Sequence, residues 1–324
     1  MEYSASEGKA WAREHLVGQW TTMITPFTAD DELDLDGLRH NIDHVLGLGT
    51  RGMGFSWNMG EFWSLTHEER LRLLEAVPDL VKHRARIAFQ ATGTSLKEVV
   101  ATCQEAGRLG YDFAIVAPPY LMTHTEEQVL DFVARVSERA GIGLAFYNSP
   151  QFGITLSARA LSKLADLPNV IAIKEASFNQ SLSIDAHLDA GKKVVVSTPD
   201  EEIFFFEGFY GFHQQVMFAN TSDWRFDTAK EPNYGKFIDL ATHSRLAEAR
   251  SLYERIWPIK SVSRRWWSRI AGRTGGSLPV QMVKYWGELM GLKAGPVRPP
   301  LSPLSEVERT ELRADLGRLG LIDR

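Results

Sequence analysis

Short apolar segments alternate with amphipathic segments along most of the chain. Eight of the apolar segments have the length of strands, and most are apolar on both faces, as buried parallel strands are. These predicted strands are Gln19–Thr25, Arg51–Ser56, Arg86–Ala91, Asp112–Val116, Ile142–Tyr147, Val170–Lys174, Lys193–Thr198 and Gln215–Ala219. The pattern predicts a parallel α/β fold built from repeated strand–helix units.

The amphipathic segments between the predicted strands carry helix-start signals. A hydroxyl residue stands three positions before Glu or Gln in Thr66–Glu69, Ser95–Glu98 and Thr125–Gln128, which is the spacing of a capping box. Eight strand–helix units are the number that closes a (β/α)8 TIM barrel. A doubly wound sheet is the weaker alternative, because Thr25–Thr28 stands where its Gly-rich dinucleotide turn is expected.

The two ends of the chain differ from the repeating part. Residues 1–17 are predicted as an N-terminal extension, and residues 18–224 as the strands and helices of the barrel. Residues 225–324 are predicted as the last barrel helix and a C-terminal helical extension packed on the barrel. The helices expected there are Lys236–Trp257, Leu278–Gly291 and Ser305–Leu321, with a basic and aromatic segment, Arg264–Gly276, after the first.

Composition and charge narrow the classes of protein that fit. Hydrophobic residues make up 44% of the chain and charged residues 24%, with a formal net charge of -5, so disorder and a nucleic-acid surface are both disfavoured. Cys103 is the single cysteine, which excludes an intrachain disulfide. No stretch reaches the roughly 18 apolar residues of a membrane span, and Met1–Glu7 lacks signal-peptide features. We expect a cytoplasmic protein that binds neither nucleic acid nor membrane.

Lys174 is the unusual residue among the predicted strand ends, where a barrel carries its catalytic side chains. It follows the apolar run Val170–Ile173, so burial should lower the pKa of its amine and free the amine to attack a carbonyl. Tyr147 ends the preceding strand and could move protons beside it. Glu175 should point to the other side of its strand. A lysine paired with a carboxylate and a tyrosine that only packs remain the alternative.

Six short segments at the strand ends and near the C-terminus follow one another in a recognisable order. They are Thr25–Phe27, Met59–Glu61, Ala117–Tyr120, Tyr147–Pro150, Ile171–Ala176 and Ala294–Pro300. Together they resemble the dihydrodipicolinate synthase/N-acetylneuraminate lyase family of class I, Schiff-base-forming pyruvate aldolases. The resemblance extends from Gly18 to Leu321. It implies imine chemistry without a metal or organic cofactor, and a homotetramer made of two tight dimers.

The resemblance also implies roles for individual residues. Lys174 would form the Schiff base with pyruvate or another 2-oxo acid, and Tyr147 would be the proton shuttle. Tyr120 matches a relay tyrosine that is often donated across the dimer interface. The backbone amides of the turn formed by Asn58, Met59 and Gly60 would hold the substrate carboxylate at the start of a helix. Gln215 matches a position that lines the substrate.

Two departures from the family pattern affect the expected substrate. Trp57, Asn58 and Met59 stand where the family has a glycine and two hydroxyl residues, so carboxylate binding and the hydroxyl relay to Tyr147 are both altered. Phe152 stands where the synthase branch has an arginine for a second carboxylate, which argues against aspartate semialdehyde.

Large aromatic residues near these departures suggest a different second substrate. Trp57, Trp63, Phe152 and Phe178 could build an apolar wall for a hydrophobic or aromatic aldehyde, as in the hydratase-aldolase branch, although they could equally be packing residues. The sequence therefore predicts a lyase of the aldolase or hydratase-aldolase type. A sugar-acid dehydratase or aldolase of the same family and a non-catalytic 2-oxo-acid-binding homologue remain alternatives. Asp200–Glu202 is interpreted as a helix start with favourable negative charge, and a contact with a substrate hydroxyl is the minor alternative.

Overall fold

Eight strands lie where the sequence predicts them, with ends that differ by a few residues. They are β1 (Gly18–Thr22), β2 (Gly52–Phe55), β3 (Arg86–Gln90), β4 (Phe113–Val116), β5 (Leu144–Asn148), β6 (Val170–Glu175), β7 (Val195–Ser197) and β8 (Val216–Phe218). The computed structural model describes residues 2–4, 6–218 and 221–323. Ala219, the predicted end of the last strand, lies outside the described residues, as does Asn220.

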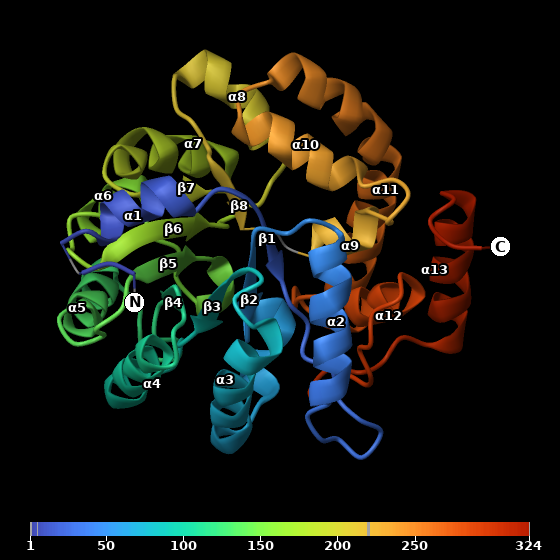
Figure 1. Ribbon diagram of the computed structural model, residues 1–324, viewed down its shortest axis with the longest axis horizontal. Helices are drawn as coiled ribbons and strands as arrows, with labels where there is room; N and C mark the ends of the chain where they lie inside the picture. Colours follow the sequence, from blue (N-terminus) through green and yellow to red (C-terminus); the bar gives the residue numbers. More distant parts are fainter. Residues whose placement is uncertain (1, 5, 219–220, 324) are drawn as a thin grey trace. The chain divides into compact units, whose positions relative to one another are not determined.

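The strands form a single sheet in the order β7-β6-β5-β4-β3-β2-β1-β8 (Figure 1). Pairing is parallel between β1 and β8 and between each neighbouring pair from β3 to β7. The two ends of this order also meet, because the Phe218 amide donates to the Ser197 Oγ over 2.9 Å and the Thr198 amide donates to the Gln214 Oε1 over 2.6 Å. The predicted (β/α)8 TIM barrel is confirmed.

The chain divides into two compact units. One unit consists of Met1–Trp20, Arg86–Ala219 and Ala241–Leu246, and the other of Thr21–Ala85, Asn220–Leu240 and Ala247–Arg324.

Helices cover the outer face of the strands in the first unit (Figure 1). They are α4 (Leu96–Arg108), α5 (Glu126–Ser137), α6 (Ala158–Leu164), α7 (Gln180–Asp189) and α8 (Ile203–Tyr210), with short 3-10 turns η3 (Pro150–Phe152) and η4 (Ala190–Lys192). The N-terminal helix α1 (Gly8–His15) packs beside β6 and β7. Inside, the rings of Trp20, Phe113 and Phe218 meet with centroids 5.1–5.8 Å apart, so side chains from β1, β4 and β8 fill the interior.

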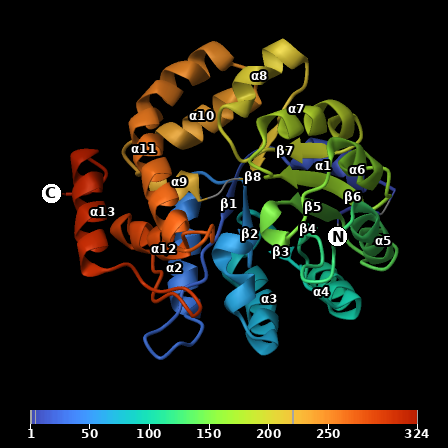
Figure 2. The same cartoon turned by 180° about the vertical axis from the view of Figure 1, so that it is seen from behind.

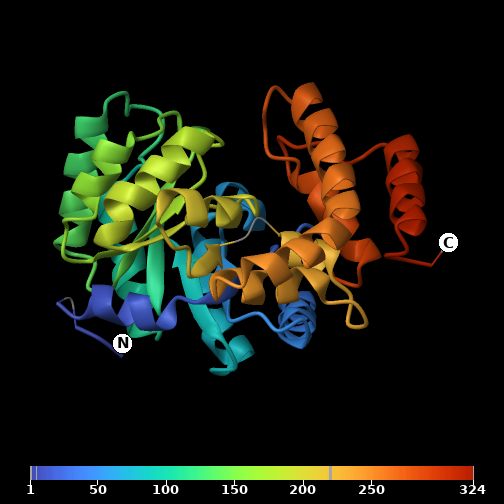
Figure 3. The ribbon, with the colours of Figure 1, turned by 90° about the horizontal axis from the view of Figure 1, so that it is seen from above.

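The second unit carries the remaining helices. They are α2 (Leu35–Gly47), α3 (His67–Val81), α9 (Ser222–Phe226), most of α10 (Asn233–Thr242), α11 (Leu246–Arg273), α12 (Val280–Leu289) and α13 (Glu306–Arg318), with 3-10 turns η1 (Asn58–Gly60) and η2 (Phe62–Ser64). Helices α2 and α3 pack side by side (Figure 2). Helix α13 lies along α11 (Figure 3). Asp315 of α13 accepts hydrogen bonds from Trp266 (2.7 Å) and Arg265 (2.5 Å) of α11.

The predicted helix starts are largely confirmed. Thr66 and Thr125 each form a complete capping box at the starts of α3 and α5. At the start of α4 the Ser95 hydroxyl accepts a hydrogen bond from the Glu98 amide. Each cap satisfies amides that the first helical turn leaves without a partner, which explains why these helices begin at these residues.

The prediction of one helix over Lys236–Trp257 is wrong. Helix α10 ends at Thr242, the backbone of Ser244 is left-handed with φ 57°, and α11 begins at Leu246. The basic and aromatic segment Arg264–Gly276 is also helical as far as Arg273. Ile256, Trp266 and Ile270 lie on the buried face of α11. Their burial stabilises the helix even though Pro258 lies in its interior.

Candidate active site

Lys174 and Tyr147 lie beside each other near the carboxyl ends of β6 and β5. The strand register pairs Tyr147 with Lys174, and the Lys174 Nζ is 5.0 Å from the centre of the Tyr147 ring. Both side chains are buried, with exposed fractions of 2% for Lys174 and 6% for Tyr147. The structure therefore brings together the two residues that the sequence assigns to the chemical step, and it holds them on two paired strands.

The residues that follow them point to the opposite face of the strands. The Glu175 carboxylate accepts hydrogen bonds from the Asn148 Nδ2 (3.4 Å), from the Ser177 amide (3.0 Å) and from the Ser183 hydroxyl of α7. Because α7 covers the outside of the strands, Glu175 and Asn148 face outward, and alternation along a strand turns Lys174 and Tyr147 inward. The predicted direction of Glu175 is confirmed.

Burial lowers the pKa of the Lys174 amine from its ordinary value of 10.5 to about 7. Removing the charged ammonium form from water is unfavourable, so burial makes the neutral amine more stable relative to the ammonium form. At neutral pH the unprotonated form of the Lys174 amine is then well populated. This is the property that an amine needs to attack the carbonyl carbon of a ketone.

The Tyr147 phenol is neutral at neutral pH, because burial raises its pKa to about 12. The neighbouring Ser149 hydroxyl acts in the opposite direction and lowers this pKa. The Phe152 ring meets the Tyr147 ring edge to face, with centroids 5.5 Å apart and an interplanar angle of 74°. Phe152 itself is only 3% exposed. The phenol ring is therefore in contact with an apolar ring, while its hydroxyl has a polar neighbour.

Ser149 is the residue of this site that the sequence interpretation missed. It lies between Asn148, the last residue of β5, and Pro150, the first residue of η3, and its own backbone is extended, with φ -151° and ψ 140°. Two positions after Tyr147 in extended chain, it belongs to the same face as Tyr147. The signal that could have identified it was therefore this spacing of two residues.

The turn formed by Asn58, Met59 and Gly60 is a single 3-10 turn, η1, in the second unit. Asn58 and Met59 are 5% and 3% exposed, and the Trp63 indole donates to the Asn58 carbonyl over 3.0 Å. Gly60 is required here, because a Cβ on it would lie 2.2 Å from the Met23 carbonyl oxygen. The sequence analysis expected the start of a helix here, but this turn does not continue into a longer helix. A helix dipole therefore contributes little to carboxylate binding at this turn.

The other aromatic residues differ in their exposure. Trp57 is buried against β2, where its ring fills the space beside Gly54. Trp63 is 37% exposed and Phe178 is 67% exposed, so neither is packed like Phe152. Tyr120 is half-buried in the loop after β4. Its role as a relay residue stays a prediction.

The structure places Gln215 away from the predicted substrate. Its side-chain amide donates to the carbonyls of Arg13 (2.7 Å) and Leu16 (2.8 Å), which satisfies the C-terminal end of α1. Gln215 also precedes β8, at the opposite end of the strand from the ends that carry Lys174 and Tyr147. The substrate-lining prediction for Gln215 is therefore wrong, and we leave this residue out of the proposed site.

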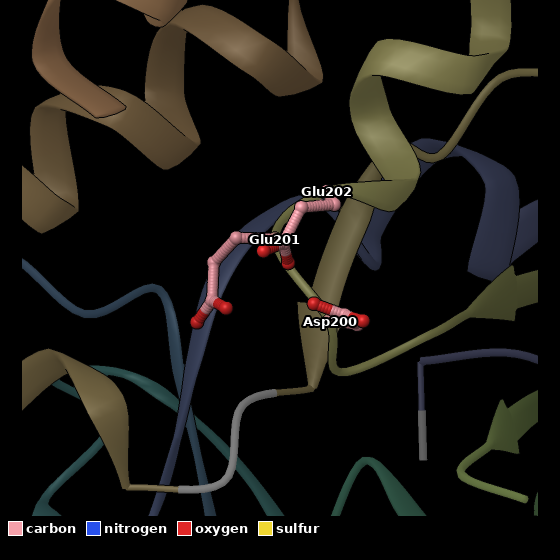
Figure 4. Close-up of side chains that lie close together, drawn as sticks. All are labelled: Asp200, Glu201 and Glu202. Atoms are coloured by element: carbon pink, nitrogen blue, oxygen red, sulfur yellow. The ribbon is translucent and has the colours of Figure 1, made fainter. Parts of the chain in front are cut away.

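Three neighbouring carboxylates, Asp200, Glu201 and Glu202, gather at the turn after β7 (Figure 4). One oxygen from each lies within 4.8 Å of the others, which is a spacing that a cation could bridge. Helix α8 begins directly after them at Ile203. Negative charge is favourable at a helix N-terminus, so the helix accounts for this cluster and we assign it no metal.

Comparison with known proteins agrees with this geometry. The sequence profile of the Dihydrodipicolinate synthetase family matches residues 15–319. A 4-hydroxy-tetrahydrodipicolinate synthase from Moorella thermoacetica is 27% identical over 313 residues, covering 94% of this chain and all of the relative. A second such synthase, from Methanothermobacter thermautotrophicus, is 34% identical over 161 residues, covering 49% of this chain and 57% of the relative.

Solved structures share the fold. YagE, a prophage protein of the dihydrodipicolinic acid synthase family from E. coli K12 solved in complex with pyruvate, superposes with a TM-score of 0.80 at 23% identity. It covers 94% of this chain and 99% of its own. Dihydrodipicolinate synthase from Thermotoga maritima gives a TM-score of 0.80 at 22% identity, covering 95% of this chain and all of its own.

The match over nearly the whole chain identifies the class of enzyme. Among the residues that the structure describes, no helix is both long and apolar enough to cross a membrane. The strand order, the buried lysine and the profile match agree with one another. The chain belongs to the dihydrodipicolinate synthetase family and is a lyase of the class I aldolase type.

Proposed function

We propose that the enzyme makes or breaks a carbon–carbon bond next to an imine that pyruvate, or a pyruvate-derived group, forms on Lys174. The observation that carries this proposal is the buried Lys174 amine with a pKa of about 7, held 5.0 Å from the Tyr147 ring. The neutral amine attacks the ketone carbon, and water leaves after protons have moved from nitrogen to oxygen. The resulting iminium withdraws electrons from the neighbouring bond, which lowers the barrier to breaking or forming that bond.

Tyr147 is the proposed proton carrier of these steps. Its phenol is protonated at neutral pH, so it can donate a proton to a leaving oxygen and recover one later. The turn of Asn58, Met59 and Gly60 remains the proposed holder of the substrate carboxylate, and Tyr120 the proposed relay. Both of these roles rest on family resemblance. A cytoplasmic location and a homotetramer also remain predictions from the sequence.

We further propose that the second substrate is a hydrophobic or aromatic aldehyde. Support comes from Phe152, which is buried, apolar and in edge contact with Tyr147. A cation at this position would favour an aldehyde with its own carboxylate, whereas an aromatic ring favours an apolar one. The rival is the 4-hydroxy-tetrahydrodipicolinate synthase activity named for the full-length relatives.

Borohydride trapping tests the imine. Incubation with pyruvate and borohydride should add a reduced pyruvate group to Lys174, located by peptide mass spectrometry, and should inactivate the enzyme. The Lys174→Ala variant should remain unmodified. If wild-type protein gains no adduct on Lys174 over a pH range from 6 to 9, the proposal is wrong.

A substrate panel tests the aldehyde. Arylidene pyruvates and aldol adducts of aryl aldehydes should release pyruvate, while sugar acids and aspartate semialdehyde should react much more slowly. Preferred turnover of sugar acids would indicate the dehydratase or sugar-acid aldolase alternative. Pyruvate binding that survives Lys174→Ala, with no product from any member of the panel, would indicate a non-catalytic binding protein.

A further inference from the structure

Ser149 has no assigned role, and its position beside Tyr147 gives it one. Its side chain is buried, with 1% of the residue exposed. Within the described part of the chain, its Oγ forms no well-aligned hydrogen bond with any group. A buried hydroxyl without such a bond is unfavourable by about 1–3 kcal/mol, so such groups are rare in folded proteins unless they serve a function.

The backbone around Ser149 is tightly fixed. The neighbouring Asn148 side chain accepts a hydrogen bond from the Leu156 amide (2.9 Å) and donates to the Leu156 carbonyl (3.1 Å). The Asn148 amide also reaches the buried Glu175 carboxylate. On the other side, the Phe152 amide donates to the Ser149 carbonyl over 3.3 Å. Ser149 therefore cannot move away from the end of β5 without breaking several buried contacts.

The fixed backbone directs the Ser149 hydroxyl toward Tyr147. Residues two apart in extended chain share a face, so the side chains of Tyr147 and Ser149 project in the same direction. Ser149 lowers the pKa of Tyr147, whereas burial raises it. This is the direction expected of a hydrogen-bond donor, because a donor stabilises the phenolate form. Phe152 contacts the Tyr147 ring, and its side chain can make no hydrogen bond with the phenol oxygen.

We propose that Ser149 is a positioning residue that donates a hydrogen bond to the Tyr147 oxygen whenever Tyr147 has given up its proton. The inference rests on the proposed function, because it assigns Ser149 to the proton transfers of the imine pathway. Tyr147 transfers its proton to the departing oxygen and is left as a phenolate, and the Ser149 hydroxyl orients toward that oxygen while keeping its own proton. The phenolate then accepts a proton from the methyl group of the pyruvate imine, which leaves the neutral enamine and regenerates the phenol.

Deuterium exchange tests this role without any aldehyde. Wild-type enzyme in D2O should incorporate deuterium into the methyl group of pyruvate, and NMR of the methyl signal measures the rate of this exchange. The Ser149→Ala variant should exchange about tenfold more slowly, the effect of losing one hydrogen bond worth about 1.4 kcal/mol to the charged phenolate. The final amount of borohydride-trapped adduct on Lys174 should be unchanged, because Ser149 is proposed to change the rate of proton transfer and not the amine that forms the imine.

Two variants that are isosteric with each other, Ser149→Thr and Ser149→Val, provide the matched control. Ser149→Thr keeps the hydroxyl and should exchange within about threefold of wild type, whereas Ser149→Val has the same shape without it and should match Ser149→Ala. A purely structural role would change melting temperature in step with exchange rate in all three variants. Wild-type exchange in both Ser149→Ala and Ser149→Val would overturn the inference. That result would leave the proposed function intact as long as Lys174 is still trapped.

Discussion

At the scale of single residues, the chemistry depends on how deeply the Lys174 amine is buried. The pKa of Lys174 is about 7 because the amine is taken out of water at the end of an apolar strand. The neutral amine is the attacking form, and its population rises as pH increases through the pKa. An exposed lysine would carry its proton up to a pH of about 10.

The first prediction concerns the pH dependence of imine formation. The rate of imine formation with pyruvate should fall about tenfold per pH unit below about pH 7 and should be level above it. Single-turnover trapping between pH 5.5 and 9.5 measures this rate. A rate that keeps rising up to pH 10 would show that Lys174 is not buried as described.

The second prediction concerns the stability of the same residue. Because the pKa of Lys174 is lowered on folding, the unfolded state binds more protons between about pH 7 and about pH 10.4, and stability should rise with pH across that window. Lys174→Met should remove this slope and raise the free energy of unfolding at pH 7, by an amount on the order of 2 kcal/mol. Urea unfolding at pH 7 and pH 10 measures both effects, and equal slopes for the two proteins would contradict the prediction.

The third prediction concerns Phe152 and the choice of aldehyde. Phe152→Arg should place a cation beside Tyr147 and lower kcat/KM for aryl aldehydes about 10- to 100-fold, because the apolar contact is lost and a charge is added. Turnover of an aldehyde that carries a carboxylate should increase. Phe152→Leu, which keeps an apolar side chain, is the control and should retain the preference for aryl aldehydes. If Phe152→Arg leaves the ratio of kcat/KM between the two kinds of aldehyde unchanged, Phe152 does not determine specificity.

At the scale of elements, the turn between β2 and α3 depends on a buried ion pair within the second unit. The Lys284 Nζ of α12 lies 2.5 Å from the Glu61 Oε1, and the two side chains are 2% and 0% exposed. Lys284 also donates to the Pro296 carbonyl over 2.9 Å. Glu61 has a left-handed backbone, with φ 66°, between η1 and η2. The pair therefore holds a strained position that directly follows the Asn58–Gly60 turn.

The fourth prediction follows from this pair. Lys284→Met should leave the Glu61 charge buried without its partner and should lower the free energy of unfolding by about 3–5 kcal/mol. The double variant Glu61→Gln with Lys284→Met should be markedly more stable than this single variant, because it leaves no charge uncompensated. Arg39→Ala removes the exposed pair with Asp36 and should produce no measurable change in urea unfolding, which makes it the control. Equal losses in the single and double variants would show that the pair is not coupled.

At the scale of the whole molecule, two pairs of exposed apolar residues in the first unit are where we propose that the predicted tetramer forms its contacts. The loop after Tyr120 exposes Leu121 (79%) and Met122 (80%), and α8 exposes Phe209 (86%) and Tyr210 (50%). Large apolar side chains that project into water together are typical of interfaces. We propose that each pair forms one of the two kinds of contact in the predicted tetramer.

The fifth prediction assigns a different consequence to each pair of exposed residues. Leu121→Asp should reduce the size of the assembly and also lower kcat, because Tyr120 is predicted to be donated across this contact. Phe209→Glu should reduce the size of the assembly but leave kcat nearly unchanged. Sedimentation velocity and steady-state kinetics measure the two effects, and Arg39→Glu on exposed surface is the control. A wild-type protein that sediments as a monomer would contradict the prediction.

The strand–helix alternation and the chemistry of Lys174 could be read from the amino-acid sequence. An apolar strand places its last residues at a fixed end of a barrel, and the period of two determines which neighbours share a face. This reasoning correctly turned Glu175 away from Lys174. Applied to the Tyr147–Ser149 spacing, it would also have identified Ser149. The break between α10 and α11 was missed, because the left-handed backbone of Ser244 has no strong signal in a sequence.

Only the tertiary structure decided how far each group is removed from water and which distant group it meets. The pKa of Lys174 depends on packing from many segments, and the Gln215 amide is occupied by carbonyls of α1, about 200 positions away in the chain. Local pattern specifies the direction of a side chain, because direction follows from backbone geometry. Burial and long-range partners depend on the folding of the whole chain, so single residues carry little information about them.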